Sequence, residues 1–282
     1  MQRVYEVEII STGDEIIFGQ LVDTNASWIA KQSTEQGARV RRVSCVGDNV
    51  EDIVKAIEGG LLEARDLIVI TGGLGPSNDD LTIEALAKVA GKKVFYDPRA
   101  LKMLASNCRV ALIDLTERRK KMARSVEGAE PLDNSLGLAP GVKMSVGSTI
   151  LVALPGIPKE MKPMFKRFVL PLIAETTFKR ASAIKLQILM PYYSTFSILS
   201  KLRNLFPEVY IKTHSRPPNH EKEPAQMHGI RVDILVWGAS EEECTTRREE
   251  VTSRLKELAE TKGGRIIIET VESLGKSDDR FT

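Results

Sequence analysis

At 282 residues the chain is longer than most single domains, so we expect two domains, each with its own hydrophobic core. Lysine and arginine number 40 against 38 aspartate and glutamate, which leaves no strongly basic field for nucleic acid. No apolar run reaches the roughly 20 residues that a membrane-spanning helix needs. The three cysteines, Cys45, Cys108 and Cys244, lie far apart without a C-x-x-C pair, which favours a reducing compartment. We therefore expect a cytoplasmic protein without a membrane or nucleic-acid partner.

The first part of the chain alternates predicted strands with predicted helices. Strands are expected over 4–10, 39–46 and 67–70, and the last is a continuous apolar run typical of strands covered on both faces. Helices are expected from Thr24 to about Glu35 and over the residues after Asp48, where apolar side chains share one face. Because short connections join alternating elements, the pattern predicts an α/β fold with a parallel sheet.

A glycine-rich turn, Thr71-Gly72-Gly73-Leu74-Gly75-Pro76, follows the strand over 67–70. Asp79 and Asp80 come next, and the apolar periodicity from Ile83 predicts a helix. A strand, a glycine turn and a helix N-terminus together can bind an anion, because unpaired N–H groups and the helix dipole point into the turn. The alternative is that the turn is only a tight connection between strand and helix.

The middle of the chain is predicted to contain two helices and a long loop. Asp97-Pro98 is expected to open a helix whose buried stripe includes Leu112 and Leu115, with residues 117–121 as a solvated helix end rather than a lid. Residues 128–147 are rich in glycine, proline and asparagine and are expected to form one loop. A strand is predicted over 149–153, followed by a helix that Pro171 should end or kink near Leu170.

The pattern changes after about residue 175. Apolar and polar residues alternate over 184–188 and 230–236, which predicts strands with one exposed face. A short helix and a strand over 208–213 should lie between them, and a helix opened by the capping box of Ser240 and Glu243 should follow. With a last strand over 265–271, the order β-α-β-β-α-β predicts a small α+β module. The expected domains are therefore 1–174 and 175–274, with a tail at 275–282.

Several segments of the first domain should meet at one edge of its sheet. The carboxyl ends of parallel strands share an edge, and ligands of such sheets bind beyond it. Residues 12–15, Asp48 and the glycine turn follow three successive strands and should converge there. Asp48 and Asp80 could hold a divalent cation or activate water, because hard cations prefer carboxylate oxygens. The alternative is that each aspartate only caps a helix.

Other ligand motifs are weaker. The glycine turn is not a G-x-G-x-x-G fingerprint, which would need glycine at Asn78, and Gly275-Lys276-Ser277 is not a P-loop, because Thr270 replaces its first glycine. The three histidines, His214, His220 and His228, fall in one proline-rich segment. Their spacing is not that of a compact zinc site, so we favour a loop that carries histidines over a zinc site.

Taken together, the motifs resemble the CinA family, a branch of the molybdopterin-binding MoaB/MogA-like domains. The resemblance covers about residues 4–172 and rests on ordered motifs. They are Ser11-Thr12-Gly13-Asp14-Glu15, Gly19, Asp23-Thr24-Asn25, Val46-Gly47-Asp48, the glycine turn, Asp79-Asp80-Leu81-Thr82, Asn134, Gly137, Ala139-Pro140-Gly141 and Leu154-Pro155-Gly156-Ile157-Pro158-Lys159-Glu160-Met161. Residues after about 175 look like the KH-type middle domain of CinA proteins, although no clear G-x-x-G loop is present. The amidase domain of full-length CinA proteins has no counterpart here, so its activity is not expected.

The resemblance implies a MoaB/MogA-like three-layer fold with a nucleotide or pterin phosphate at the glycine turn. CinA-type domains hydrolyse the pyrophosphate of ADP-ribose with a divalent metal and potassium, whereas MogA-like domains bind molybdopterin and some adenylylate it. Leu74 stands where MogA-like proteins usually have threonine, which favours the hydrolase, while Ser77 and Leu138 depart from the usual CinA threonines. We therefore expect a metal-dependent hydrolase of an ADP-ribose-like compound, using Mg²⁺, Co²⁺ or Ni²⁺ and K⁺. The alternative is a molybdopterin-binding or adenylyl-transferring protein.

The resemblance and the expected sheet edge together suggest residue roles. Asp80 and Asp48 are expected to be catalytic, and the metal is expected to contact Asp14, Glu15, Asp79 and Asp80. Lys159 would neutralise developing charge. The phosphates are expected on Thr12, Gly13, Gly72, Gly73, Leu74, Gly75, Pro155 and Gly156. Further copies of the chain are expected as partners, and a non-enzymatic alternative makes the second module a docking scaffold.

Overall fold

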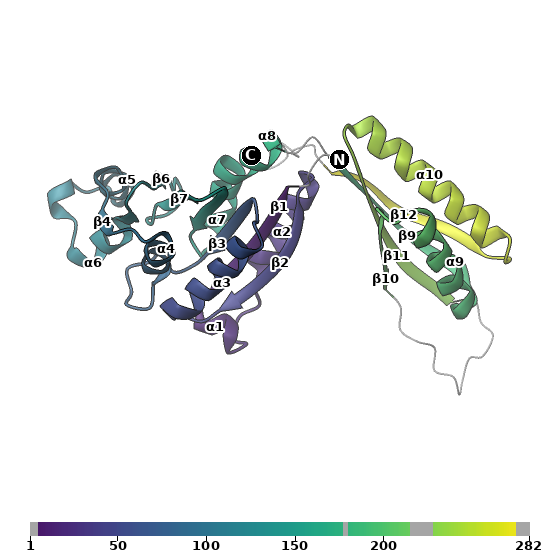
Figure 1. Ribbon diagram of the computed structural model, residues 1–282, viewed down its shortest axis with the longest axis horizontal. Coiled ribbons are helices and arrows are strands. Elements are labelled where there is room, and N and C mark those ends of the chain that lie inside the picture. Colours follow the sequence, from purple (N-terminus) through teal and green to yellow (C-terminus); the bar gives the residue numbers. More distant parts are fainter. Residues whose placement is uncertain (1–4, 177–179, 215–227, 275–282) are drawn as a thin grey trace. The chain divides into compact units, whose positions relative to one another are not determined.

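The computed structural model describes residues 5–176, 180–214 and 228–274 (Figure 1). The chain divides into two compact units, of which the first comprises residues 1–34 and 38–176 and the second residues 35–37 and 177–282. No helix in these described ranges combines the length and apolar character that crossing a membrane requires. The expected tail at 275–282 and His220 lie outside the described residues.

The first unit is built on a six-stranded sheet with the order β2-β1-β3-β8-β7-β6. Its strands are β1 (Glu6–Thr12), β2 (Arg39–Val46), β3 (Leu67–Thr71), β6 (Glu130–Leu132), β7 (Gly141–Val146) and β8 (Thr149–Leu154). β2, β1, β3 and β8 are parallel, whereas β7 and β6 pair antiparallel with their neighbours. The predicted α/β class is confirmed, with an antiparallel extension at one side.

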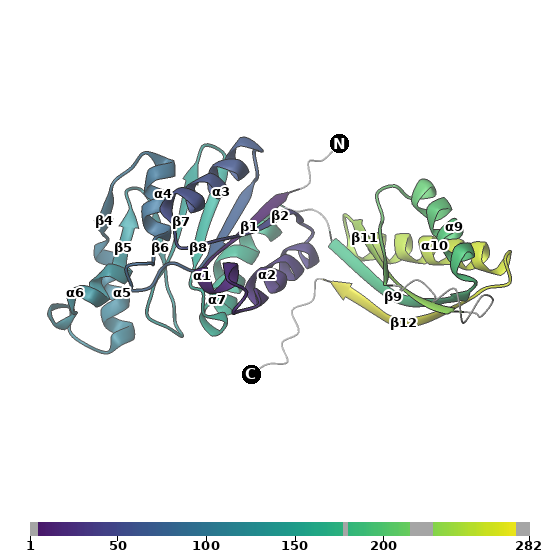
Figure 2. The ribbon, with the colours of Figure 1, turned by 90° about the horizontal axis from the view of Figure 1, so that it is seen from below.

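Helices cover both faces of this sheet, which confirms the predicted three layers. Its longer helices are α2 (Thr24–Glu35), α3 (Val50–Leu62), α4 (Thr82–Ala90), α5 (Pro98–Cys108), α7 (Pro158–Met164) and α8 (Leu170–Thr176). Ile10, Ile68 and Ile70 pack under α3 and α4, while Ile9 and Val69 face α2 and α7. Figure 2 shows α3 and α4 on one face of the sheet and α2 and α7 on the other. Because neighbouring strand residues point to opposite faces and both faces are covered, the central strands are apolar throughout.

Shorter elements complete the first unit. They are α1 (Asp14–Ile17), the 3₁₀ turns η1 (Leu112–Asp114) and η2 (Lys121–Ala123), α6 (Glu117–Lys120), the π-helical turn η3 (Phe165–Val169), and the antiparallel pair β4 (Val94–Tyr96) and β5 (Arg124–Val126). In Figure 2, β4, β5, α5 and α6 gather at one end of the unit.

Two local predictions are corrected. The helix opened by Asp97-Pro98 ends at Cys108, because Arg109 adopts a left-handed φ of 55°, and Leu112 is 47% exposed rather than part of a buried stripe. Residues 128–147 are not one loop, since they contain β6 and β7. Of the two effects predicted for Pro171, an end or a kink near Leu170, the helix does not end there, and a π-helical turn over Phe165–Val169 directly precedes Leu170. A proline lacks an N–H, so irregular pairing in the preceding turn is its expected consequence.

The second unit is a four-stranded antiparallel sheet covered by two helices. Its elements are β9 (Arg180–Met190), α9 (Tyr192–Leu205), β10 (Tyr210–His214), β11 (His228–Gly238), α10 (Glu241–Glu260) and β12 (Arg265–Leu274), and the strand order is β10-β11-β9-β12. One half of the predicted capping box is present, since Ser240 Oγ accepts the Glu243 N–H at 3.1 Å, whereas Glu243 Oε2 accepts the N–H of Ala239, one residue before the N-cap, at 2.7 Å. The alternating residues Ile184, Leu186 and Ile188 are buried under the helices. This is the split βαβ arrangement that the element order predicts.

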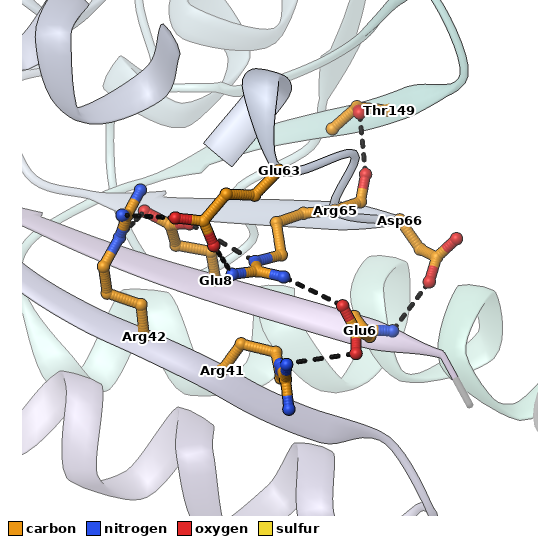
Figure 3. Close-up of polar contacts among 8 residues, drawn as sticks. All are labelled: Glu6, Glu8, Arg41, Arg42, Glu63, Arg65, Asp66 and Thr149. Carbon is orange, nitrogen blue, oxygen red and sulfur yellow. Dashed lines mark hydrogen bonds and ion pairs between the residues drawn. The ribbon is translucent and has the colours of Figure 1, made fainter. Parts of the chain in front are cut away.

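A network of charged side chains lies at the start of β1, β2 and β3 (Figure 3). It comprises Glu6, Glu8, Arg41, Arg42, Glu63 and Arg65. Glu8 is fully buried, with its Oε1 2.7 Å from Arg42 Nε and its Oε2 3.7 Å from Arg65 Nε. Since a buried carboxylate is tolerated only beside compensating charge, these pairs fix β1 against its neighbours at the end away from the glycine turn.

Candidate functional site

The candidate site is formed by the loops that follow the four parallel strands. The register pairs Thr12 with Val46, Ser11 with Thr71, and Thr71 with Leu154, so β1, β2, β3 and β8 end at one edge. The segments 13–15, 47–48, 72–80 and 155–159 therefore start side by side, as the order of strands predicts. Because β7 runs antiparallel to β8 and β6 runs antiparallel to β7, β6 ends and β7 begins at this edge, so the loop 133–140 that joins them lies there as well.

The glycine turn uses some of its N–H groups within the protein. Gly72 N–H donates to Leu154 O at 3.0 Å, and Gly75 N–H donates to Asp80 Oδ1 at 2.8 Å. Gly72 and Gly73 have positive φ values of 102° and 65°, which glycine tolerates best. For the N–H groups of Gly73 and Leu74, the described part of the chain provides no hydrogen-bond acceptor. Of the four N–H groups expected to receive an anion, those of Gly72 and Gly75 are therefore already used within the protein.

Asp80 holds the turn together rather than capping α4. Its Oδ1 accepts the Gly75 N–H and its Oδ2 accepts the Ser77 N–H at 2.7 Å. The N-cap of α4 is Leu81, which makes no side-chain cap, so the capping alternative for Asp80 is wrong. Thr82 closes the other side, because its Oγ1 donates to Gly72 O at 2.8 Å. The catalytic and metal-binding roles expected of Asp80 must coexist with these two accepted hydrogen bonds.

Asp48 forms a reciprocal pair with Asp14. The Asp14 N–H donates to Asp48 Oδ2 and the Asp48 N–H donates to Asp14 Oδ1, each at 3.1 Å. Asn49 is the N-cap of α3, with its side chain accepting from Glu51 and Asp52, so the capping alternative for Asp48 is also wrong. Burial raises the pKa of Asp48 above its ordinary value, the hydrogen bond from Asp14 lowers it, and the charges of Asp14, Glu15 and Asp79 raise it further.

These carboxylates form an acidic side of the site beside the glycine turn. A Cβ on Gly47 would lie 2.6 Å from Asp14 Oδ1, and one on Gly13 would lie 2.7 Å from the Glu15 carboxylate, so both acidic side chains lie against glycine backbone. Within the described ranges, no three histidine, cysteine, aspartate or glutamate side chains are grouped as a metal site would need. A cation held by the predicted side chains Asp14, Glu15, Asp79 and Asp80 would therefore also need oxygen atoms from a bound small molecule.

An open pocket of about 790 Å³ adjoins this acidic side. It lies between β2 and α3, and its lining includes Asp14 and Asp48, the cations Arg42 and Lys55, and the apolar Val46. Neither the glycine turn nor Pro155-Gly156 lines it. The pocket therefore extends the site on the side of the carboxylates.

The fourth loop packs tightly against the glycine turn. A Cβ on Gly156 would lie 3.4 Å from the Gly72 Cα, which shows how closely the two backbones approach. Asn25, at the start of α2, is nearly buried, and its Nδ2 donates to Gly156 O at 2.7 Å. Lys159 is exposed in the first turn of α7. The structure thus brings Gly156 to the turn, while Lys159 stays at the rim.

Some residues that shape this edge had no role in the sequence analysis. Asn134 is fully buried in the loop 133–140, where its Nδ2 donates to Ala139 O at 3.0 Å and to Glu160 Oε2 at 2.7 Å. In the sequence, Asn134 and Asn25 stand out only as members of the motifs on which the family resemblance rests. Lys121, which contacts the turn from the segment after α6, had no signal beyond a charged run.

Comparison with known proteins identifies relatives that cover most of the chain and others that match its first unit. Residues 8–175 match the family described as "Probable molybdopterin binding domain". A protein of Pyrobaculum arsenaticum is 34% identical over 258 residues, covering 91% of this chain and 95% of the relative. Protein PF0476 of Pyrococcus furiosus is 38% identical over 226 residues, covering 76% and 86%. The crystal structure of CinA from Thermoplasma acidophilum matches with a TM-score of 0.55 and 39% identity, over 58% of this chain and 95% of that one.

Proposed function

Because the chain belongs to the family described as "Probable molybdopterin binding domain", we propose that its first unit binds a phosphorylated pterin of the molybdopterin type at the candidate site. The observation that carries this proposal is the pair of N–H groups on Gly73 and Leu74, which are left without an acceptor in a turn otherwise held by hydrogen bonds. Unpaired backbone N–H groups in a glycine turn at the carboxyl end of a strand suit a phosphate.

The acidic side of the site supports a ligand with amino groups beside its phosphate. Asp14 and Asp48 offer carboxylate oxygens, which accept hydrogen bonds from the N–H groups of a pterin ring. The adjoining pocket of about 790 Å³ is within the size range of small-molecule sites. Phosphate on the turn and ring on the carboxylates is therefore the orientation we propose.

The test is pterin retention. The chain is produced in a bacterial host that makes molybdopterin, purified, and oxidised to release the fluorescent pterin for chromatography. Wild type and Gly147→Ala should retain similar amounts, whereas Gly73→Ala should retain less than about a tenth, because a Cβ on Gly73 meets Thr82 and Thr12 while one on Gly147 meets nothing within 4 Å. Wild type that carries no pterin, and binds none when it is added, would overturn the proposal.

A second candidate, metal-dependent hydrolysis of an ADP-ribose-like diphosphate, is favoured by one observation. Asp48 faces the charges of Asp14, Glu15 and Asp79, and a divalent cation bound to a diphosphate would relieve that repulsion. AMP release from ADP-ribose is measured with Mg²⁺, Co²⁺ or Ni²⁺, with and without K⁺. Asp48→Asn should lower the rate at least about tenfold, while Glu58→Gln, on the exposed side of α3, should not. Wild type without AMP release under all these metals contradicts this candidate.

A further inference from the structure

The turn that carries the candidate site is also contacted from a distant part of the chain. Asp80 takes up the N–H groups of Gly75 and Ser77, and its own N–H donates to Ser77 O at 3.3 Å. Lys121 adds a donor from outside the stretch: its Nζ donates to Ser77 O and to Asp80 O, the latter at 3.2 Å. One ammonium group therefore contacts the carbonyl groups of Ser77 and Asp80, the first and last residues of the stretch 77–80.

The segment that presents Lys121 is fixed independently of the turn. Met122 and Ala123 are buried in the core beneath α4 and α5. Arg124 Nη2 lies 2.6 Å from Glu84 Oε1, and Glu84 is in the first turn of α4, which begins two residues after Asp80. Residues 121–124 thus contact two successive parts of the chain. Lys121 contacts residues 77–80, and Arg124 contacts the start of α4.

We propose that Lys121 is a positioning residue of the ligand site. By donating to Ser77 O and Asp80 O, it keeps residues 77–80 in the conformation in which Asp80 can accept the N–H groups of Gly75 and Ser77. The N–H groups of Gly73 and Leu74 are then left for a phosphate, and the ammonium charge near the turn favours that anion. The inference rests on the proposed function for its ligand, but not for the conformation of the turn.

The experiment measures the turn and the ligand separately in the full chain. Amide hydrogen exchange of residues 72–80 is followed without ligand, and inorganic pyrophosphate binding is measured by calorimetry. Lys121→Met keeps a side chain of similar length without donors, so exchange at these residues should rise about tenfold and pyrophosphate should bind about tenfold more weakly. Lys121→Arg, which retains paired donors, should restore both within about twofold.

Lys120→Met is the matched control, because Lys120 pairs with Glu117 at 2.6 Å on the preceding turn rather than with the glycine turn. Exchange in Lys121→Met that equals wild type or Lys120→Met would overturn the inference. If Lys121→Met is unfolded by circular dichroism, Lys121→Gln takes its place, and wild-type exchange in that variant overturns the inference equally. Faster exchange in a protein whose wild type binds no pyrophosphate supports the positioning role while counting against the proposed function.

Discussion

Asp48 is a single carboxylate held where its charge is disfavoured. Burial raises its pKa in the folded protein, and the neighbouring charges of Asp14, Glu15 and Asp79 add to that effect, although the hydrogen bond from Asp14 opposes it. The ordinary pKa of this carboxyl is 3.8, and its pKa in the folded protein is higher. As the pH rises above 3.8, the folded protein therefore binds more protons at this group than the unfolded protein does. Its ionised form therefore lowers stability at neutral pH, and the penalty is absent below that value.

Replacing Asp48 with asparagine should consequently stabilise the ligand-free protein at pH 7, by roughly 2 °C in the melting temperature. Asparagine keeps an oxygen that can accept the Asp14 N–H but removes the charge. Thermal melts between about pH 4 and 8 should show the gain shrinking as the pH falls toward the ordinary pKa. Glu58→Gln should show no such trend, and an Asp48→Asn variant less stable than wild type at pH 7 would contradict this account.

Gly73 and Gly147 allow backbone strain to be separated from crowding. Their φ values are similar, at 65° and 58°, but a Cβ on Gly73 would press on Thr82 and lie 3.2 Å from Thr12 Oγ1, whereas one on Gly147 meets nothing within 4 Å. Gly147→Ala should lower the free energy of unfolding by about 1 kcal/mol through strain alone. Gly73→Ala should lower it by about 3 kcal/mol, because Thr82 must also give up its hydrogen bond to Gly72 O. Urea unfolding of both variants would measure the difference, and equal losses would mean that Thr82 moves aside freely.

At the scale of elements, the sequence predicted best the segments whose local signals agree. β3 is a continuous apolar run, and Asp97-Pro98 does begin α5, with Asp97 Oδ1 accepting the Arg99 N–H at 2.7 Å. The sequence does not predict β6 and β7, because Pro131 and Gly141 are typical of loops; β7 forms by antiparallel pairing with β8, and β6 by antiparallel pairing with β7. The end of α5 was missed because nothing about Arg109 marks a left-handed residue.

The candidate site shows the same division between local and tertiary information. The convergence of the loops after β1, β2, β3 and β8 follows from the strand order, so the sequence could predict it. Which N–H groups remain unpaired depends on the direction of the Asp80 side chain, and that is decided by tertiary packing. The contact of Lys121 joins residues 44 positions apart, and no local pattern reports it.

The ion-pair network joins three elements, and Glu8 is its buried centre (Figure 3). Glu8→Gln would keep the shape of the side chain but leave Arg65, itself mostly buried, with less opposite charge. We expect a loss of about 3 kcal/mol in the free energy of unfolding. Glu117→Gln, which breaks the exposed pair with Lys120, should cost less than about 0.5 kcal/mol. Unfolding followed by Trp28, which packs edge-on against Phe165 in the first unit, in a Trp237→Phe background would measure both. Similar losses of stability in Glu8→Gln and Glu117→Gln would show that the buried pairs of Glu8 stabilise the fold no more than one exposed ion pair does.

For the molecule as a whole, the distribution of the cores decides what can fold alone. The buried clusters of the first unit draw their residues from 5–173, whereas the third cluster draws its residues from 184–266. None of these clusters of described residues includes side chains from both sides of residues 177–179. Each unit therefore has the apolar burial that independent folding requires.

We expect a fragment ending at Thr176 to fold and to keep the ligand binding of the full chain. Every residue assigned here to the candidate site, from Thr12 to Lys159, lies within it, as do Lys121 and the Glu8 network. Its melting temperature, monitored by Trp28, should match that of the corresponding transition in the full chain within about 3 °C, and its pterin content should equal that of the full chain. A fragment with a native circular dichroism spectrum but no pterin, compared with a full chain that retains it, would mean that the second unit takes part in binding. An unfolded fragment would instead show that the first core depends on residues beyond 176 for its stability.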